Sequence, residues 1–218
     1  MYDRLTKTIM KQIIEKDFNC IDVGCHKGEI LDDMLKYAPK GKHWGFEPIP
    51  YMFQDLQTKY NQTAHILPYA LSDKNATSSF QLVKNAPAYS GIMKRKYDVK
   101  EADIEEIQVE LKRLDDIIPT DTPIHFIKID VEGGEYDVLK GAINILKKHR
   151  PYIIFEFGLG ASDFYGTTPE QIYRLLNDEV QLKISSLKDF VNHKSALSLE
   201  QFKQAYDSNK EYYFIAHI

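Results

Sequence analysis

The chain has little cysteine. Its two cysteines, Cys20 and Cys25, are too few for the disulfide framework of a small secreted domain. Their spacing also differs from the CxxC pair that is typical of zinc sites and thioredoxin-like redox sites. We therefore expect both thiols to be free, as they would be in a reducing cytosol.

Long hydrophobic runs and an excess of basic charge are also lacking. No apolar stretch reaches the roughly 18 residues of a membrane-spanning helix, and Met1–Lys7 does not lead into a signal-peptide core. We therefore expect a cytoplasmic protein with no membrane partner. With 28 basic and 32 acidic residues the formal charge is −4, which argues against nucleic acid as a partner.

What the chain does have is enough apolar material for one core, since hydrophobic residues make up 43% of its 218 residues. Short apolar runs without alternation predict strands that are buried on both faces. These runs are Cys20–Val23, His43–Phe46, Ile66–Leu71, Ile124–Ile129, Tyr152–Phe157 and Tyr212–Ile218. Helical patterns lie between them, on Ile30–Leu35, Val138–Leu146 and the segment after Thr168 and Pro169.

Strands that alternate with helices predict an α/β fold with a doubly wound, mostly parallel sheet. The alternation breaks between Ser72 and Ile118, where Ser78–Val83 and Ile107–Leu111 predict strands on either side of a polar loop, Lys84–Asp103. This insertion is the natural place for a lid or a specificity segment, although a plain connector has the same composition. No linker is visible, so residues 1–218 are interpreted as a single domain.

A glycine turn follows the first predicted strand. Asp22, Gly24 and Gly28 precede a helix, which is the order found where a doubly wound fold binds a nucleotide. His26 stands where the dinucleotide fingerprint has its second glycine, and Asp22 disfavours a phosphate. A nucleoside that carries an amino acid suits the turn better, because its ammonium group complements Asp22. A purely structural turn is the alternative.

Polar residues at the ends of the next two strands extend this site. Glu47, followed by Pro48, lies close to the spacing at which a carboxylate accepts hydrogen bonds from both ribose hydroxyls. Ser72 and Asp73 could reach an adenine amino group, but capping a turn is an equally good use of both. Ser90, in the insertion, could cover the cofactor or belong to an ordinary loop.

The most distinctive stretch is Ile127–Ala142, which reads I-K-I-D-V-E-G-G-E-Y-D-V-L-K-G-A. It resembles the signature of FkbM-type methyltransferases, which are class I enzymes that depend on S-adenosylmethionine. The resemblance covers about residues 18–158, and the other motifs occur in the order of that family. They are the Asp22/Gly24/Gly28 turn, Phe46-Glu47-Pro48, Ala70–Asp73, Leu114-Asp115-Asp116 and Pro151–Glu156.

The resemblance implies a seven-stranded Rossmann-like sheet with an antiparallel last strand, which Tyr212–Ile218 would supply. It implies O-methyl transfer to a sugar, a polysaccharide precursor or a similar hydroxylated metabolite. By position, Asp22, Gly24 and Gly28 would line the methionine portion of S-adenosylmethionine, Glu47 the ribose, and Ser72 and Asp73 the adenine. Family members often carry a small residue and Asn where this chain has Cys25 and His26, so the backbone amides of this loop are expected to make the contacts.

Three residues are the candidates for the chemistry. Asp130 follows a central strand, at the edge where ligands bind in open α/β sheets, and Glu156 ends the next strand. Lys128 interrupts a buried run and needs a partner, for which we expect Asp22 or Glu156. Asp130 is the expected proton acceptor, with capping of the following helix as the alternative role.

A divalent metal held by Asp130 and Glu156 is the less favoured alternative, because the spacing suggests no third ligand. Glu132 and Glu135 begin the next helix, where the helix dipole alone explains acidic residues. A nicotinamide-dependent dehydrogenase and a non-catalytic binding module on the same fold are the two alternative functions. The sequence does not indicate the oligomeric state.

Overall fold

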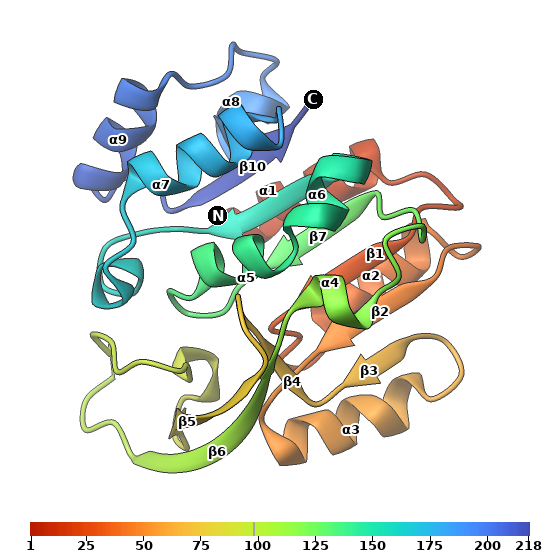
Figure 1. Ribbon diagram of the computed structural model, residues 1–218, viewed down its shortest axis with the longest axis vertical. Coiled ribbons are helices and arrows are strands. Elements are labelled where there is room, and N and C mark those ends of the chain that lie inside the picture. Colours follow the sequence, from red (N-terminus) through yellow and green to blue (C-terminus); the bar gives the residue numbers. More distant parts are fainter. Residues whose placement is uncertain (98) are drawn as a thin grey trace.

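A seven-stranded sheet forms the centre of the computed structural model, which describes residues 1–97 and 99–218 (Figure 1). Its order is β3-β2-β1-β7-β8-β10-β9, and β10 runs antiparallel to both of its neighbours. The strands are β1 (Cys20–Val23), β2 (His43–Phe46), β3 (His65–Leu67), β7 (Phe126–Ile129), β8 (Tyr152–Glu156), β9 (Lys183–Ser186) and β10 (Tyr213–His217). The expected α/β sheet with an antiparallel last strand is confirmed.

Helices cover both faces of this sheet, because successive strand residues point to opposite sides. Ile153 and Phe155 of β8 pack against one layer of helices, and Ile154 between them packs against the other. The first layer holds α5 (Glu135–Gly141), α6 (Ile143–His149), α7 (Pro169–Tyr173) with its π-helical continuation Arg174–Glu179, and α9 (Leu199–Asp207). The second holds α1 (Tyr2–Ile13), α2 (Glu29–Tyr37), α3 (Pro50–Tyr60) and α8 (Leu187–Val191).

A second, three-stranded sheet lies at the edge beside β2 and β3 (Figure 1). Its order is β4-β6-β5, with β4 (Tyr69–Leu71), β5 (Ala76–Val83) and β6 (Ile104–Lys112). The short helix α4 (Leu114–Ile117) leads from β6 back to the main sheet, and a 3-10 turn, Pro87–Tyr89, follows β5. This sheet is the small insertion that the sequence predicts.

Two predicted elements differ from the structure. The run Ile66–Leu71 is not one strand, because Pro68 lacks an N–H group and divides it into β3 of the main sheet and β4 of the small sheet. The helical pattern Val138–Leu146 likewise forms two helices, α5 and α6, which meet at Ala142. The strand β9 is not predicted from the sequence, because Lys183–Ser186 has only one large apolar residue, Ile184.

The register of the central strands brings their polar ends together. Asp22 on β1 pairs with Lys128 on β7, and Glu156 at the end of β8 pairs with Tyr213 at the start of β10. Asp130 follows β7 directly, and its N–H donates to the carbonyl of Val23. The five side chains therefore lie along one edge of the sheet.

Within the described residues, no helix is long and apolar enough to cross a membrane.

Candidate active site

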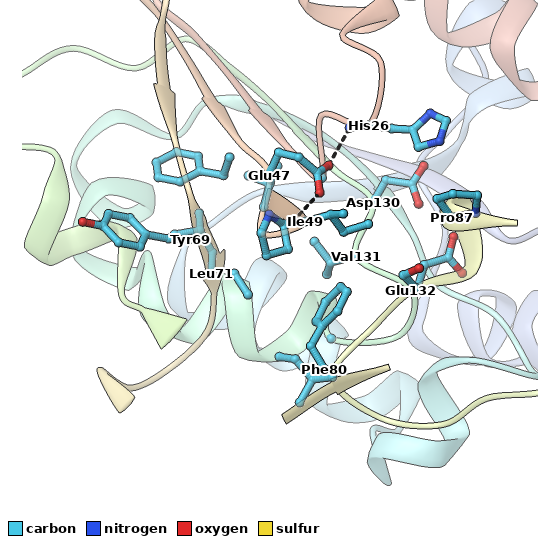
Figure 2. A pocket seen from close by; sticks show the side chains of 18 of the residues that line it. His26, Glu47, Ile49, Tyr69, Leu71, Phe80, Pro87, Asp130, Val131 and Glu132 are labelled. Carbon is cyan, nitrogen blue, oxygen red and sulfur yellow. Dashed lines mark hydrogen bonds between the residues drawn. The ribbon is translucent and has the colours of Figure 1, made fainter. Parts of the chain in front are cut away.

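Two adjoining pockets open along the carboxyl ends of β1, β2 and β7. The first is bounded by Glu47 and Pro48 on one side and by apolar residues of the small sheet on the other (Figure 2). The second extends toward Asp22 and Lys128. Gly24, His26 and Asp130 line both pockets, so the two form one continuous cleft with Asp130 in its middle.

The glycine turn forms the floor of this cleft. Gly24 has a φ of 82°, in the left-handed region, and a side chain there would collide with the carbonyl oxygen of Asp130. The backbone N–H groups of Gly24 and Cys25 both donate to the carbonyl of Phe46, at 3.0 and 3.1 Å. The turn is thereby fixed to the end of β2 and packed directly on the segment that carries Asp130.

Glu47 is held by the backbone on both of its oxygens. Oε2 accepts from the N–H of His26 at 2.8 Å, and Oε1 accepts from the N–H of Ile49 at 2.9 Å (Figure 2). The carboxyl group is buried, and burial raises its pKa to about 7 although the two N–H groups act in the opposite direction. Each oxygen keeps a second lone pair, so Glu47 presents a rigid acceptor to the first pocket.

Asp22 lines the second pocket, and one of its carboxylate oxygens lacks a hydrogen-bond partner within the described part of the chain. It is 2% exposed, and its Oδ2 has no hydrogen-bond partner among the residues that the structure describes. Burial raises its pKa to about 7, against the opposing influence of the Lys128 ammonium group. A buried carboxylate oxygen without a partner is costly, and a cationic ligand group in the second pocket would relieve that cost.

Much of the lining of the first pocket is apolar. It includes Ile49, Tyr69, Leu71, Phe80, Pro87 and Ile92. Most of these residues come from the small sheet and the turn that follows β5, so the insertion supplies much of the apolar lining (Figure 2). A slot of this kind suits a flat aromatic ring.

The structure does not bring every expected cofactor residue to the cleft. Ser72 and Asp73 line neither pocket; Ser72 is buried, and Asp73 forms an ion pair with Lys140. Gly28 also lies outside both pockets, where its carbonyl accepts from the hydroxyl of Tyr60. Ser90 lines the first pocket, but its hydroxyl already accepts from the N–H of Val83 at 2.9 Å.

Cys25 lines the second pocket, with its thiol 3.3 Å from the carbonyl oxygen of Asp22. Both cysteines are free and buried, as expected. His26 has a left-handed φ of 49°, and its ring points away from Glu47 (Figure 2). Burial lowers the pKa of His26, and the neighbouring Lys27 acts in the same direction.

Asp130 lies at the centre of a buried ionic network. Its Oδ2 accepts from Lys128 Nζ at 2.8 Å and from the hydroxyl of Tyr213 at 2.6 Å. Lys128 is 4% exposed, and its ion-pair partner is Asp130 rather than Asp22 or Glu156, the two expected from sequence. Burial opposes ionisation of Asp130, but the charge of Lys128 and the hydrogen bonds from Glu156, Lys128 and Tyr213 together outweigh it, so the pKa of Asp130 lies below its usual range.

Glu156 faces Asp130, and its pKa is shifted in the opposite direction. Burial and the negative charge of Asp130 raise the pKa of Glu156 well above its ordinary value. The two carboxyl groups lie close enough to share a proton, and the directions of their pKa shifts place that proton on Glu156. Near neutral pH, Asp130 is therefore the ionised member of the pair.

The loop after Asp130 adds Glu132 to the cleft. Glu132 has a φ of 60°, and its carboxylate pairs with Arg95 of the insertion. Glu135 holds this loop in place, because its Oε1 accepts from the N–H groups of Val131 and Gly133, both at 3.1 Å. Glu135 is thus a buried anchor for the loop and does not line either pocket.

Asp130, Glu132 and Glu156 form a cluster that could hold a metal ion, since one oxygen of each lies within 4.8 Å of the others. Glu132 is the third carboxylate that the spacing of the sequence did not suggest. The cluster is already close to electrical balance, because Lys128 and Arg95 neutralise two carboxylates and the third holds the shared proton. The charges of this site therefore do not require a cation.

A family model for the methyltransferase FkbM domain matches residues 22–182. The chain belongs to the FkbM methyltransferase family. The family's region begins at Asp22 and includes the glycine turn, Glu47 and the Lys128–Glu156 network. Membership in this family decides against the nicotinamide-dependent dehydrogenase. No curated protein matches the chain in sequence.

Two solved structures show the same fold. The FkbM methyltransferase from Methylobacillus flagellatus KT is 16% identical with a TM-score of 0.57, over 93% of this chain and 44% of that one. This chain thus spans less than half of that protein. A putative rRNA methylase from Clostridium thermocellum is 10% identical with a TM-score of 0.53, over 98% and 93% of the two chains. At these identities the likeness concerns the fold alone.

Sequence reasoning missed two partners of the network, Tyr213 and Arg95. Arg95 lies in the polar insertion, where nothing in the local pattern indicates its partner. Tyr213 had a usable signal: an antiparallel strand begins at the edge where its parallel neighbours end, so the first residue of the last strand reaches the cleft. Tyr213 also lies beyond the region that the family model matches.

The contact between Gly24 and the Asp130 carbonyl can be tested with a matched pair of variants. Gly166 also has a positive φ, 67°, but a side chain there would meet nothing within 4 Å. Gly166→Ala should therefore lose about 1 kcal/mol of unfolding free energy from the backbone conformation alone. Gly24→Ala should lose at least about 2 kcal/mol, because the collision is added. Equal losses in urea unfolding would show that the turn is not packed on the Asp130 segment.

Proposed function

We propose that the protein transfers the methyl group of S-adenosylmethionine to a hydroxyl oxygen of a carbohydrate or a similar polyhydroxylated metabolite. The observation that carries this proposal is the arrangement of the cleft. A rigid acceptor and an apolar slot lie at one end, a carboxylate with an unpartnered oxygen lies at the other, and ionised Asp130 lies between them. Each of the three parts matches one part of the proposed chemistry.

The fit to the cofactor rests on residues of both pockets. Glu47 would accept hydrogen bonds from the ribose hydroxyls, and the apolar slot around Phe80 would take the adenine. Asp22 would pair with the amino group of the methionine portion, which supplies the partner that Oδ2 lacks. The reactive centre between these groups would then lie beside Gly24 and Asp130, two of the three residues that both pockets share.

S-adenosylmethionine supplies a methyl group on a sulfonium; the acceptor oxygen forms a bond to that carbon as the carbon–sulfur bond breaks, and the electron pair stays on sulfur. The acceptor oxygen must lose its proton in the process. Asp130 would receive this proton, and because it is ionised near neutral pH it is ready to do so. Its low pKa suffices, because the hydroxyl proton becomes strongly acidic as the oxygen forms its third bond, to the methyl carbon, and takes on positive charge.

The acceptor class follows from the carboxyl groups around Asp130. Asp130 and Glu132 line the first pocket, and Glu156 lies beside them although it lines neither pocket. Carboxylates accept hydrogen bonds from several hydroxyl donors at once. A polyhydroxylated acceptor would satisfy such a cluster, because it donates several hydrogen bonds from neighbouring hydroxyl groups. The proposed reaction is metal-free, because Lys128 and Arg95 already balance these carboxylates.

The role of Glu47 can be tested by calorimetric titration with S-adenosylhomocysteine. Glu47→Ala should weaken binding by roughly 1–3 kcal/mol, because charge-assisted hydrogen bonds to the ribose are lost. The fold should survive, which circular dichroism checks. Glu15→Ala, at an exposed glutamate, is the control and should bind like the wild type. Unchanged affinity in Glu47→Ala would remove the residue from the cofactor site.

The raised pKa values of Asp22 and Glu47, both about 7, make cofactor affinity depend on pH. An ammonium group and ribose hydroxyls bind the ionised carboxylates best. Affinity should therefore rise as the pH increases from about 6 to about 8, and binding near pH 6 should release protons. Calorimetry in two buffers of different ionisation enthalpy measures both effects. Constant affinity without proton release would contradict the assignment of these two carboxylates.

Asp130→Asn tests the proton transfer. The variant keeps the shape of the side chain but cannot accept a proton, so methyl transfer should slow by about 10²–10⁴ while cofactor affinity changes only a few-fold. The assay follows S-adenosylhomocysteine formation with a panel of sugars, nucleotide sugars and other polyhydroxylated metabolites. Asp55→Asn, on the exposed side of α3, is the control and should remain fully active.

Two outcomes of this assay would change the account. Full activity of Asp130→Asn would remove Asp130 from proton transfer. Loss of wild-type activity in a chelator, with recovery on adding magnesium, would replace the metal-free reaction by one in which the Asp130, Glu132 and Glu156 cluster holds a cation. Cofactor binding without turnover of any acceptor in the panel would favour a non-catalytic binding module.

A further inference from the structure

Tyr213 reaches the catalytic edge from a strand that the family match does not include. The match ends at residue 182, and Tyr213 is the first residue of β10. Because β10 is antiparallel, its first residue lies beside the last residue of β8, and Tyr213 pairs in register with Glu156. The topology of the sheet therefore brings the start of β10, and with it the Tyr213 side chain, to the edge where β7 and β8 end.

The contacts of Tyr213 converge on one atom. Its hydroxyl donates to Asp130 Oδ2 at 2.6 Å, and Lys128 Nζ donates to the same oxygen at 2.8 Å. Lys128 Nζ also lies 4.9 Å from the centroid of the Tyr213 ring. Both lone pairs of Oδ2 are thus occupied by donors from two different strands, so Oδ1 is the oxygen that remains for Glu156 and for a ligand in the cleft.

Aromatic packing fixes the ring that carries this hydroxyl. The rings of Tyr2 on α1 and of Tyr212 have their centroids 5.0 and 5.6 Å from that of Tyr213. Tyr2 is itself held, since its hydroxyl donates to Glu211 at 3.0 Å. A tyrosine packed in this way holds its hydroxyl in one place, so it can fix the orientation of the carboxylate that it contacts.

We propose that Tyr213 is a positioning residue for methyl transfer, which holds Asp130 so that Oδ1 faces the acceptor. The proposal rests on the proposed function, because it assigns Asp130 the acceptor's proton. Tyr213 does not itself exchange a proton: burial and the charge of Asp130 raise its pKa, so it remains a donor. Its O–H group stabilises the ionised form of Asp130, as the Lys128 ammonium group does.

Removing this donor should change how the carboxyl pair titrates. The charged or titratable groups around Asp130 and Tyr213 come from several elements and loops. They are Asp3 of α1, Asp22 of β1, His26 of the glycine turn, Lys128 of β7, Glu132 of the loop after Asp130, Glu135 of α5 and Glu156 of β8. None of them is altered in Tyr213→Phe, which keeps the ring. Loss of one hydrogen bond to an ionised group should therefore raise the pKa of Asp130 by about one unit.

The experiment compares Tyr213→Phe with Tyr206→Phe. Tyr206 is also a buried tyrosine with a hydrogen-bonded hydroxyl, but its partner is Ser162, remote from Asp130. Carbon-13 NMR of protein labelled at the aspartate carboxyl groups follows the titration of Asp130, with its signal assigned through Asp130→Asn. This readout needs neither cofactor nor acceptor. The second readout is the pH dependence of kcat with whichever acceptor the panel supplies.

In Tyr213→Phe we expect the Asp130 titration and the acid limb of the kcat profile to move up by about one pH unit. We also expect kcat to fall several-fold at the pH optimum, with KM for the cofactor unchanged. Tyr206→Phe should match the wild type in both readouts. An Asp130 titration that is identical in Tyr213→Phe and the wild type would overturn the proposal, whether or not methyl transfer is found.

A second contradicting result is a shifted Asp130 titration with an unshifted pH profile of kcat, because Tyr213 would then act on Asp130 without acting on the reaction. If no acceptor is methylated while the titration shifts, the proposed function fails, and the positioning role fails with it.

Discussion

The ion pair between buried Lys128 and Asp130 is the interaction on which the site depends. A lysine within a central strand is costly to bury, and here a carboxylate two residues further along the same strand edge compensates it at 2.8 Å. This pair keeps Asp130 ionised, and ionised Asp130 in turn keeps the shared proton on Glu156. The glycine turn packs against the Asp130 carbonyl, and the loop that follows Asp130 is anchored by Glu135. Both are thus arranged around the Lys128–Asp130 ion pair.

The central sheet could be predicted from the sequence because most of its strands are short apolar runs whose residues are mainly buried. β1 and β2 have the predicted bounds, since turn residues end both runs sharply. The failures have local causes. Pro68 directs one apolar run into two sheets, and β9 has too little apolar character to be distinguished from a loop.

The site was predictable where it depends on strand ends and not where it depends on distant contacts. Asp22, Glu47 and Asp130 line the cleft because a residue at the carboxyl end of a parallel strand must lie at that edge. The same rule places Ser72 and Asp73 near the cleft, but the turn after β4 directs Asp73 to Lys140 instead. Tyr213 and the Arg95–Glu132 pair join residues far apart in the chain, and no local pattern encodes such pairs.

The central claim is that one cleft binds the two ends of S-adenosylmethionine with its reactive centre beside Asp130. A crystal structure of the complex with S-adenosylhomocysteine tests this most directly. We predict that the ribose hydroxyls bind Glu47, that the amino group lies on Asp22 Oδ2, and that the sulfur lies between Gly24 and Asp130. A ligand bound outside this cleft, or one whose sulfur lies away from Asp130, would contradict the account.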